Sequence, residues 1–263
     1  MKKACLNFSF DDGRIDNFTI AYPILKNYDL PATFNITTGY IKGVLPYTAL
    51  GTAKPMTIEM VKELYSDKSI EIAGHGYLHR NTAEDIIQGI ETLCDELGTD
   101  TLCDGKCGFA SPGTALDLNY YNSIKAVLEH KNIQYVRLSL RYLGNAKLKT
   151  YYRKASRLIK LPILYRLAYQ DTLMDSINND IIYSVPILSS ITISELDALI
   201  KNAINEKKAL VMMFHSIVDD KMRDNWDFPK DRFEQLCKLI ATYQKLGKLE
   251  VSTTMKIYNE LKR

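Results

Sequence analysis

Long hydrophobic segments are absent from this sequence, which excludes the usual features of membrane insertion and secretion. No apolar run approaches the length of a transmembrane span. The first three residues, Met1-Lys2-Lys3, pass directly into the apolar run that begins at Ala4, which leaves no room for the hydrophobic segment of a signal peptide. We therefore expect a cytoplasmic protein without a transmembrane segment.

Cysteine and net charge are also low. The five cysteines are odd in number and not densely spaced, so they form no disulfide framework. Cys103 and Cys107 flank a Gly-Lys loop, but no second pair of cysteines or histidines accompanies them, and we interpret them as reduced thiols in a turn. A formal charge of +3 is too small to indicate a nucleic-acid partner, and we expect none.

The sequence does contain enough apolar material for one sizeable core. It has 263 residues, of which 46% are hydrophobic, and we expect a single domain over residues 1–263. Strand and helix patterns alternate with short connections, which favours a mostly parallel sheet, and the length favours closure of an α/β barrel. Strands are expected at residues 4–10, 32–35, 69–74, 135–139, 181–185, 210–215 and 249–252. Helices are expected at residues 15–28, 57–65, 82–97, 119–131, 193–205 and 228–246, with Thr57 as a cap.

Two adjacent carboxylates, Asp11 and Asp12, follow the first expected strand. Gly13 permits a sharp exit that leaves both of them at the C-terminal end of that strand. Because successive side chains of a strand point to opposite sides, we expect one aspartate to bind a cation and the other to handle a proton. Taken alone, the same residues are also typical of an Asp-Asp-Gly turn between a strand and a helix.

Two of the four histidines, His75 and His79, follow the strand expected at residues 69–74. On a helical turn this spacing places both imidazoles on one face, where they can bind a transition metal together with a carboxylate. Such a set leaves coordination positions open for water and substrate. The alternative is a pair of capping or core histidines. His215 ends a third apolar strand, so ionisable residues follow three strands at the face where parallel barrels assemble active sites.

These three elements resemble the motifs of the polysaccharide deacetylases of the NodB-homology type, carbohydrate esterase family 4. The first motif is similar to residues 9–13, the second to residues 75–79, and the last to the strand that ends at His215. The resemblance covers most of the chain in the expected order, and it implies a distorted (β/α)7 barrel.

The resemblance also implies a role for each residue that matches a motif. Asp11 would be the general base and His215 the general acid. Asp12, His75 and His79 would hold a divalent metal, which we expect to be Zn2+, with Co2+, Fe2+, Ni2+ and Mn2+ as alternatives.

The sequence departs from the family pattern at two motifs. Ala110 stands where the third motif has an arginine that orients the base, and residues 140–142 lack the aspartate and tryptophan of the fourth motif. Arg137 and Arg141 are the candidates to replace the missing guanidinium, and the sequence identifies no carboxylate that would orient His215.

The expected substrate-binding residues lie in and around the third and fourth motifs. A backbone N–H near Ser111 or Gly113 is the expected donor to a developing oxyanion. The full set is Ser111, Pro112, Gly113, Arg137 and Tyr142.

Two segments are expected as additions on the rim of the barrel. Residues 38–55 contain Tyr40 and are either a wall of the substrate groove or an ordinary surface loop. Residues 141–170, part of an insertion at about 141–180, are rich in lysine, arginine and tyrosine and contain no acidic residue. They are either an amphipathic helix with a solvated basic face or a cationic platform for an anionic glycan or a lipid-phosphate-linked sugar.

The motifs together predict a metal-dependent hydrolase that removes acetyl or similar acyl groups from an N- or O-acylated carbohydrate, a lipid-linked sugar included. One alternative is a carbohydrate-binding relic of the same fold, because residues that orient the catalytic groups are missing. The other is a non-haem iron oxygenase, because two histidines and a carboxylate also describe its metal site. Those oxygenases usually have all-β folds, which the alternation of strands and helices opposes.

Overall fold

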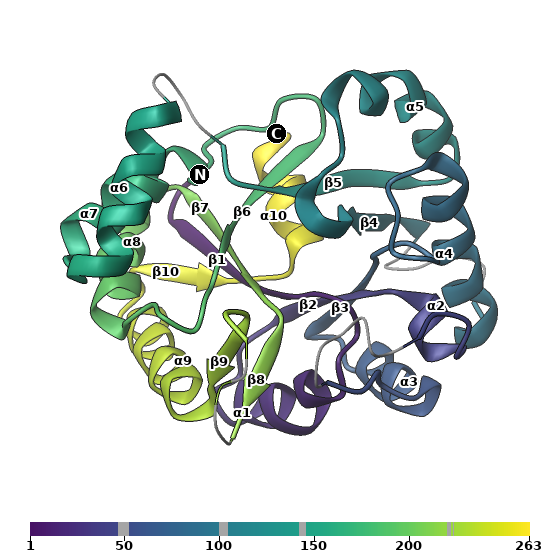
Figure 1. The fold of residues 1–263 in the computed structure, drawn as a ribbon, viewed down its shortest axis with the longest axis horizontal. Coiled ribbons are helices and arrows are strands. Elements are labelled where there is room, and N and C mark those ends of the chain that lie inside the picture. The colour runs from purple at the N-terminus through teal and green to yellow at the C-terminus, as the bar shows by residue number, and fades with distance from the viewer. Residues whose placement is uncertain (47–52, 100–104, 142–145, 220–221, 223) are drawn as a thin grey trace.

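Seven parallel strands form a closed barrel in the computed structural model, which describes residues 1–46, 53–99, 105–141, 146–219, 222 and 224–263 (Figure 1). The strands follow one another in chain order, and the last pairs with the first. The distorted (β/α)7 barrel expected from the sequence is therefore confirmed. The strands are β1 (Ala4–Phe10), β2 (Ala32–Ile36), β3 (Ile70–Gly74), β4 (Cys107–Ala110), β5 (Ile133–Ser139), β6 (Ile181–Pro186) and β7 (Ala209–Phe214).

Helices surround the barrel, and each lies in the connection that follows a strand (Figure 1). Thr57 accepts a hydrogen bond from the N–H of Met60 at 3.4 Å, which confirms it as the N-cap of α3. The helices are η1 (Asn17–Ala21) and α1 (Tyr22–Asn27) after β1, α2 (Thr38–Ile41) and α3 (Ile58–Ser66) after β2, α4 (Ala83–Leu97) after β3, η4 (Pro112–Thr114) and α5 (Leu118–His130) after β4, α6 (Ala146–Ile159), α7 (Pro162–Tyr169) and η5 (Gln170–Thr172) after β5, α8 (Ile193–Glu206) after β6, and α9 (Lys230–Lys245) after β7.

The main apolar core lies between the barrel and its helices. Side chains of a strand alternate between two faces, so every second residue of β1 points outward. The rings of Phe8 and Phe10 stack near Phe214 of β7 and meet the edge of Phe233 in α9. This packing fixes β1 against β7 at the point where the barrel closes.

The interior of the barrel holds buried polar side chains beside apolar ones. Glu71 of β3 is buried there and accepts hydrogen bonds from the Thr33 hydroxyl at 3.0 Å and the Tyr135 hydroxyl at 2.8 Å. It also accepts one from the backbone N–H of Met255 at 2.8 Å. Met255 belongs to α10 (Thr254–Leu261), a helix that the sequence did not predict. The helix packs its buried side chains into a second apolar cluster with Tyr135, so Glu71 ties the C-terminal helix to the barrel.

The strand expected at residues 249–252 forms but is not one of the seven strands that close the barrel. β10 (Leu249–Val251) pairs with residues 4–6 of β1, whereas β2 pairs with residues 8–10, so the two share one edge of β1. The barrel is closed by β7, and its remaining strand is β4, which the sequence did not predict. β4 has four residues, too few to show a clear alternation.

The helix expected at residues 228–246 begins only at Lys230. Residues 227–229 instead form β9 (Asp227–Pro229), which pairs with β8 (Ser216–Val218). Pro229 has no N–H to donate, so it ends the strand and serves as the N-cap residue of α9.

Three other expectations concern the insertion, the cysteines and the membrane. α7 packs against both α6 and α8, outside the barrel (Figure 1).

The prediction that Cys107 lies in a turn was wrong, because it is buried in β4 with its thiol free, and Cys103 lies outside the described residues. Within the described ranges, no helix combines the length and the apolar character that a membrane crossing needs. The cytoplasmic location stays a prediction.

Candidate metal centre

The C-terminal ends of β1, β3 and β7 meet at a cavity of about 380 Å3. Seven of the ten residues that the sequence singled out for the site line it; Pro112 and Arg137 do not, and Tyr142 lies outside the described residues. The seven are Asp11, Asp12, His75, His79, Ser111, Gly113 and His215. Segments separated by more than half of the chain are therefore brought to one cavity by the closure of the barrel.

Asp12, His75 and His79 form the one group of at least three acidic, histidine or cysteine side chains in the described part of the chain that could hold a metal ion. Their ligand atoms all lie within 4.8 Å of one another. Oδ1 of Asp12 lies 3.4 Å from Nε2 of His75 and 3.3 Å from Nε2 of His79. The rings of the two histidines meet edge to face, with centroids 4.9 Å apart.

The chemistry of these donors fits a cation. Nδ1 of His75 lies 2.8 Å from the carbonyl oxygen of Ala110, which can only accept, so Nδ1 carries a proton. The protonated ring donates from Nε2 to Asp12, whereas the neutral ring keeps a lone pair on Nε2 that a cation beside Asp12 can accept. Burial lowers the pKa of His75, but the charges of Asp11 and Asp12 outweigh it and raise the pKa above the usual value. Burial would likewise raise the pKa of Asp12, but hydrogen bonds with His75 and His79 hold it well below the usual range. Positive charge is therefore favoured between these groups.

Arg14 fixes the orientation of the Asp12 carboxylate. Its Nε and Nη2 donate to Oδ2 of Asp12 at 2.9 and 2.8 Å, while Nη1 donates to the hydroxyl of Ser216 at 2.9 Å. Oδ2 is thus occupied by the guanidinium and Oδ1 faces the two histidines. Arg14 was missed in the sequence, although it lies directly after the first motif.

The segment from His75 to His79 is a loop, and the prediction of a helical turn was wrong. Gly76 and His79 adopt the left-handed region, with φ of 81° and 58°. The carboxylate of Asp85, in the first turn of α4, accepts from the N–H groups of Leu78 at 2.7 Å and Arg80 at 2.9 Å. These bonds to α4 replace those of a helical turn and bring the two imidazoles together.

α4 approaches this loop very closely. A Cβ at Gly89 would lie 2.7 Å from the carbonyl carbon of Gly76 and 2.8 Å from the nitrogen of Tyr77, both of them backbone atoms. Only glycine fits at position 89 without displacing the loop that carries His79.

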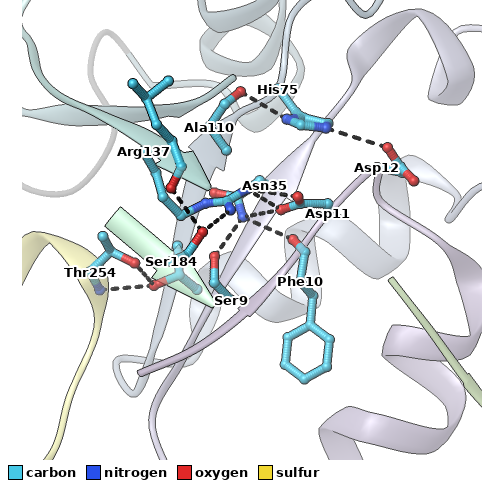
Figure 2. Close-up of polar contacts among 12 residues, drawn as sticks. Ser9, Phe10, Asp11, Asp12, Asn35, His75, Ala110, Arg137, Ser184 and Thr254 are labelled. Atoms are coloured by element: carbon cyan, nitrogen blue, oxygen red, sulfur yellow. Dashed lines mark hydrogen bonds and ion pairs between the residues drawn. The ribbon is translucent and has the colours of Figure 1, made fainter. Parts of the chain in front are cut away.

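Asp11 points into the barrel, away from Asp12 (Figure 2). It continues the inward-facing side of β1, whereas Asp12 has left the strand conformation, with φ of 76°. Nη2 of Arg137 donates to both of its oxygens, at 2.6 and 2.7 Å, and Nδ2 of Asn35 donates to Oδ1 at 2.8 Å. Burial alone would raise the pKa of Asp11, but the charge of Arg137, with smaller contributions from His75 and His215, holds it below the usual value. Asp11 is therefore ionised and fixed in position at neutral pH.

Of the two arginines considered as replacements for the missing guanidinium, Arg137 is the one that contacts Asp11. It is fully buried, and its Nη1 donates to the hydroxyl of Ser184 at 2.8 Å, so it contacts Asp11 instead of facing the cavity (Figure 2). Its expected role in binding substrate directly does not fit this position. Arg141, the other candidate, lies over the ring of Tyr183 and donates to the carbonyl oxygen of Asp171 at 3.0 Å.

His215 is half-buried at the cavity beside Trp226, whose ring centroid lies 4.4 Å from that of the imidazole. Burial lowers the pKa of His215, although the charges of Asp12 and Asp11 act in the opposite direction. Among the described residues, its Nδ1 has no hydrogen-bond partner. Trp226 is the single tryptophan of the chain, and it comes from the connection between β8 and β9 and not from the fourth-motif position.

The loop after β4 supplies the remaining wall. The N–H of Ser111 donates to the carbonyl oxygen of Arg137 at 2.9 Å, so it is not available to a substrate, and the hydroxyl of Ser111 donates to Asn81 at 2.9 Å. The carbonyl oxygen of Pro112 accepts from Nδ2 of Asn81 at 3.0 Å. Gly113, with φ of 58°, is therefore the better placed of the two expected oxyanion donors.

Tyr40 of α2 also lines the cavity, with its ring centroid 6.1 Å from that of His79. This position agrees with the first of the two roles considered for residues 38–55, a wall of the groove; residues 47–52 lie outside the described part of the chain. Asn35 and Asp85 were not identified from the sequence. Asn35 does follow the rule that polar residues at the C-terminal ends of parallel strands belong to the site.

Comparisons with known proteins agree with this geometry. Residues 1–99 match the family model described as Polysaccharide deacetylase, a stretch that contains Asp11, Asp12, His75 and His79. A search of curated proteins found no match.

Two solved structures share the fold at low identity, and a third match is weaker. The Bc1960 peptidoglycan N-acetylglucosamine deacetylase is 14% identical, with a TM-score of 0.53, over 99% of this chain and 91% of that one. A protein from Mycobacterium smegmatis, described as a possible polysaccharide deacetylase, is 16% identical, with a TM-score of 0.53, over 98% of this chain and 90% of that one. The BpsB deacetylase domain from Bordetella bronchiseptica is 16% identical, with a TM-score of 0.38, over 51% of this chain and 62% of that domain. Residues 1–99 thus match the polysaccharide deacetylase family model, and the barrel as a whole shares its fold with two solved structures described as deacetylases.

Proposed function

We propose that the chain is a metal-dependent hydrolase that removes an acetyl or similar acyl group from an N- or O-acylated carbohydrate. The observation that carries the proposal is that two adjacent carboxylates have different surroundings. Asp12 faces two imidazoles, while Asp11 lies buried against Arg137, and both line one cavity. A hydrolase needs both a cation and a fixed proton acceptor beside one substrate position.

Asp12, His75 and His79 would hold the ion, for which Zn2+ is the first candidate and Co2+, Fe2+, Ni2+ and Mn2+ are the others. When bound, such an ion polarises an acyl oxygen and lowers the pKa of water toward neutrality. One carboxylate and two imidazoles leave positions for water and substrate. Arg14 keeps the Asp12 carboxylate turned toward the histidines.

Asp11 would accept the proton of the attacking water, since the guanidinium of Arg137 keeps it ionised and fixes its orientation. The N–H of Gly113 would donate to the oxyanion that forms as the acyl carbon becomes tetrahedral. His215 would then protonate the leaving amine or alcohol, and burial, by lowering its pKa, makes the protonated ring a stronger acid. The first bond to form is water oxygen to acyl carbon, and the bond that breaks joins that carbon to the sugar nitrogen or oxygen.

A carbohydrate-binding relic is the second candidate, and one observation favours it. Nδ1 of His215 has no partner in the described part of the chain, so nothing there fixes the tautomer that an acid catalyst needs. The iron oxygenase is disfavoured because its site is usually built on an all-β fold and this site lies on a parallel barrel.

Acetate release from a panel of acetylated saccharides, soluble and lipid-linked, tests the proposal. The native chain supplied with Zn2+ is expected to release acetate from at least one of them. Asp11→Asn should retain the metal and lose turnover, whereas Asp12→Asn should lose both. Asp231→Asn, an exposed position on α9, is the matched control and should change neither. Binding of a saccharide without acyl release from any of the panel would support the relic instead.

A further inference from the structure

A second cavity, of about 320 Å3, adjoins the candidate metal centre. Ser139 at the end of β5 and the indole of Trp226 line both cavities. The same indole lies against His215, so Trp226 stands between the position of the leaving group and the second cavity. A sugar that presents its acyl group near Asp12 can therefore extend past Trp226 into this space.

The second cavity differs from the first in charge. Arg153 and Arg157 of α6 line it, and they lie one helical turn apart on the same face. Its other walls include Leu140 and Leu188, and no acidic side chain is among the described residues around it. Arg153 is half-buried and Arg157 exposed, so an anion in this cavity would meet positive charge on one wall and apolar side chains on others.

The lysines of α6, and Lys160 directly after it, do not line this cavity. Nζ of Lys149 donates to the carbonyl oxygen of Leu167 at 3.1 Å and to Asp171 at 3.2 Å, which ties α6 to the end of α7. Nζ of Lys160 donates to the carbonyl oxygen of Ser190 at 2.6 Å. Lys147 and Lys154 are exposed and do not line the cavity. The basic segment is thus neither wholly a solvated face nor a uniform platform.

We propose that the second cavity is a subsite for an anionic group, a phosphate or a carboxylate, carried by the acylated saccharide next to its reacting sugar. Arg153 and Arg157 bind this group and Trp226 packs on the sugar between the two cavities. The inference rests on the proposed function, because it assumes an acylated saccharide at the first cavity. The anion comes from a charged glycan or from the phosphate of a lipid-linked sugar. The hydrocarbon chain of a lipid-linked sugar would then lie near Leu158 and Ile159, which are 84% and 59% exposed on α6.

Tryptophan fluorescence tests the proposal without requiring turnover. Trp226 is the single tryptophan, so a change in emission on titration reports binding at this position. The probes are N-acetylglucosamine and N-acetylglucosamine 1-phosphate, added to the Asp11→Asn protein. We expect the phosphate ester to bind about tenfold more tightly or better, as a charge-assisted hydrogen bond provides. The advantage should shrink in Arg153→Gln and Arg157→Gln, vanish in the double variant, and persist in the control Lys154→Gln.

Equal affinities for the two probes, or an advantage that survives in the double arginine variant, would overturn the inference. A failure of the proposed function has a different result: no acyl release from any saccharide by the native chain, with the binding preference intact. An alkyl phosphodiester of the same sugar in detergent micelles separates the two sources. If the alkyl phosphodiester binds more tightly than N-acetylglucosamine 1-phosphate, and Leu158→Ser and Ile159→Ser remove this gain, the source is a lipid-linked sugar. Equal affinity of the two phosphates identifies a charged glycan.

Discussion

Replacing Arg137 by methionine is predicted to destabilise the protein by about 3–5 kcal/mol at pH 7, because the Asp11 carboxylate then stays buried without its partner. Arg137 has no exposed surface, and Asp11 is 2% exposed, so water cannot take the place of the lost bonds. Asn35 still donates one hydrogen bond to Asp11, which keeps the loss within this range instead of above it.

A double-mutant cycle measured by urea unfolding separates this pair from general packing. Asp11→Asn with Arg137→Met removes both charges, so the double variant should lose less free energy of unfolding than the two single variants together, by about 1–3 kcal/mol. Arg141→Met is the control, since its guanidinium bonds to backbone carbonyl oxygens and lies away from Asp11. The reasoning would be refuted if each single variant lost less than about 1 kcal/mol of unfolding free energy and the double variant lost the sum of the two.

Arg137→Met should reverse the pH dependence that Asp11 gives to the stability of the protein. In the native chain the folded-state pKa of Asp11 is lowered, so its contribution to stability is present above the ordinary pKa and lost as pH falls through the folded value. Without Arg137, burial raises that pKa, and stability should instead fall as pH rises through it. The acid limb of any hydrolytic activity should move to higher pH for the same reason.

Two further predictions concern Asp85 and Glu71. Asp85→Ala leaves the N–H groups of Leu78 and Arg80 without their acceptor. Zinc affinity, measured by competition with a chromophoric chelator, should therefore fall about 10- to 100-fold while the barrel keeps its circular dichroism spectrum. Unchanged affinity would contradict this account of the loop. Burial raises the pKa of Glu71, so its contribution to stability is full below the ordinary pKa and lost as pH rises through the folded value. The melting temperature of Glu71→Gln relative to the native chain should therefore increase from pH 4 to pH 8, and a constant difference would count against it.

Much of the fold followed from local patterns because its long elements are strongly periodic. The strand before Asp11 alternates over its whole length, and the helix after Thr57 has both a cap and an apolar face. β4 and α10 were missed because both are short, and the position of α10 depends on contacts with Glu71, which is far away in sequence.

The candidate site was predictable where one residue follows one strand, as Asp12, His75 and His215 do. It was not predictable where two distant segments meet. The loop from His75 to His79 takes its shape from Asp85, and a helical spacing alone suggested a helical turn. The choice between Arg137 and Arg141 likewise needed the register of β5, which directs Arg137 into the barrel.

The metal content of the purified chain tests the central claim most directly. After dialysis against excess Zn2+ and removal of loosely bound ions, elemental analysis should find about one equivalent of zinc in the native chain and in Asp11→Asn. Asp12→Asn and His79→Asn should retain almost none, with the barrel still folded by circular dichroism. A native chain that holds no zinc, or an Asp12→Asn variant that holds as much as the native chain, would contradict the account.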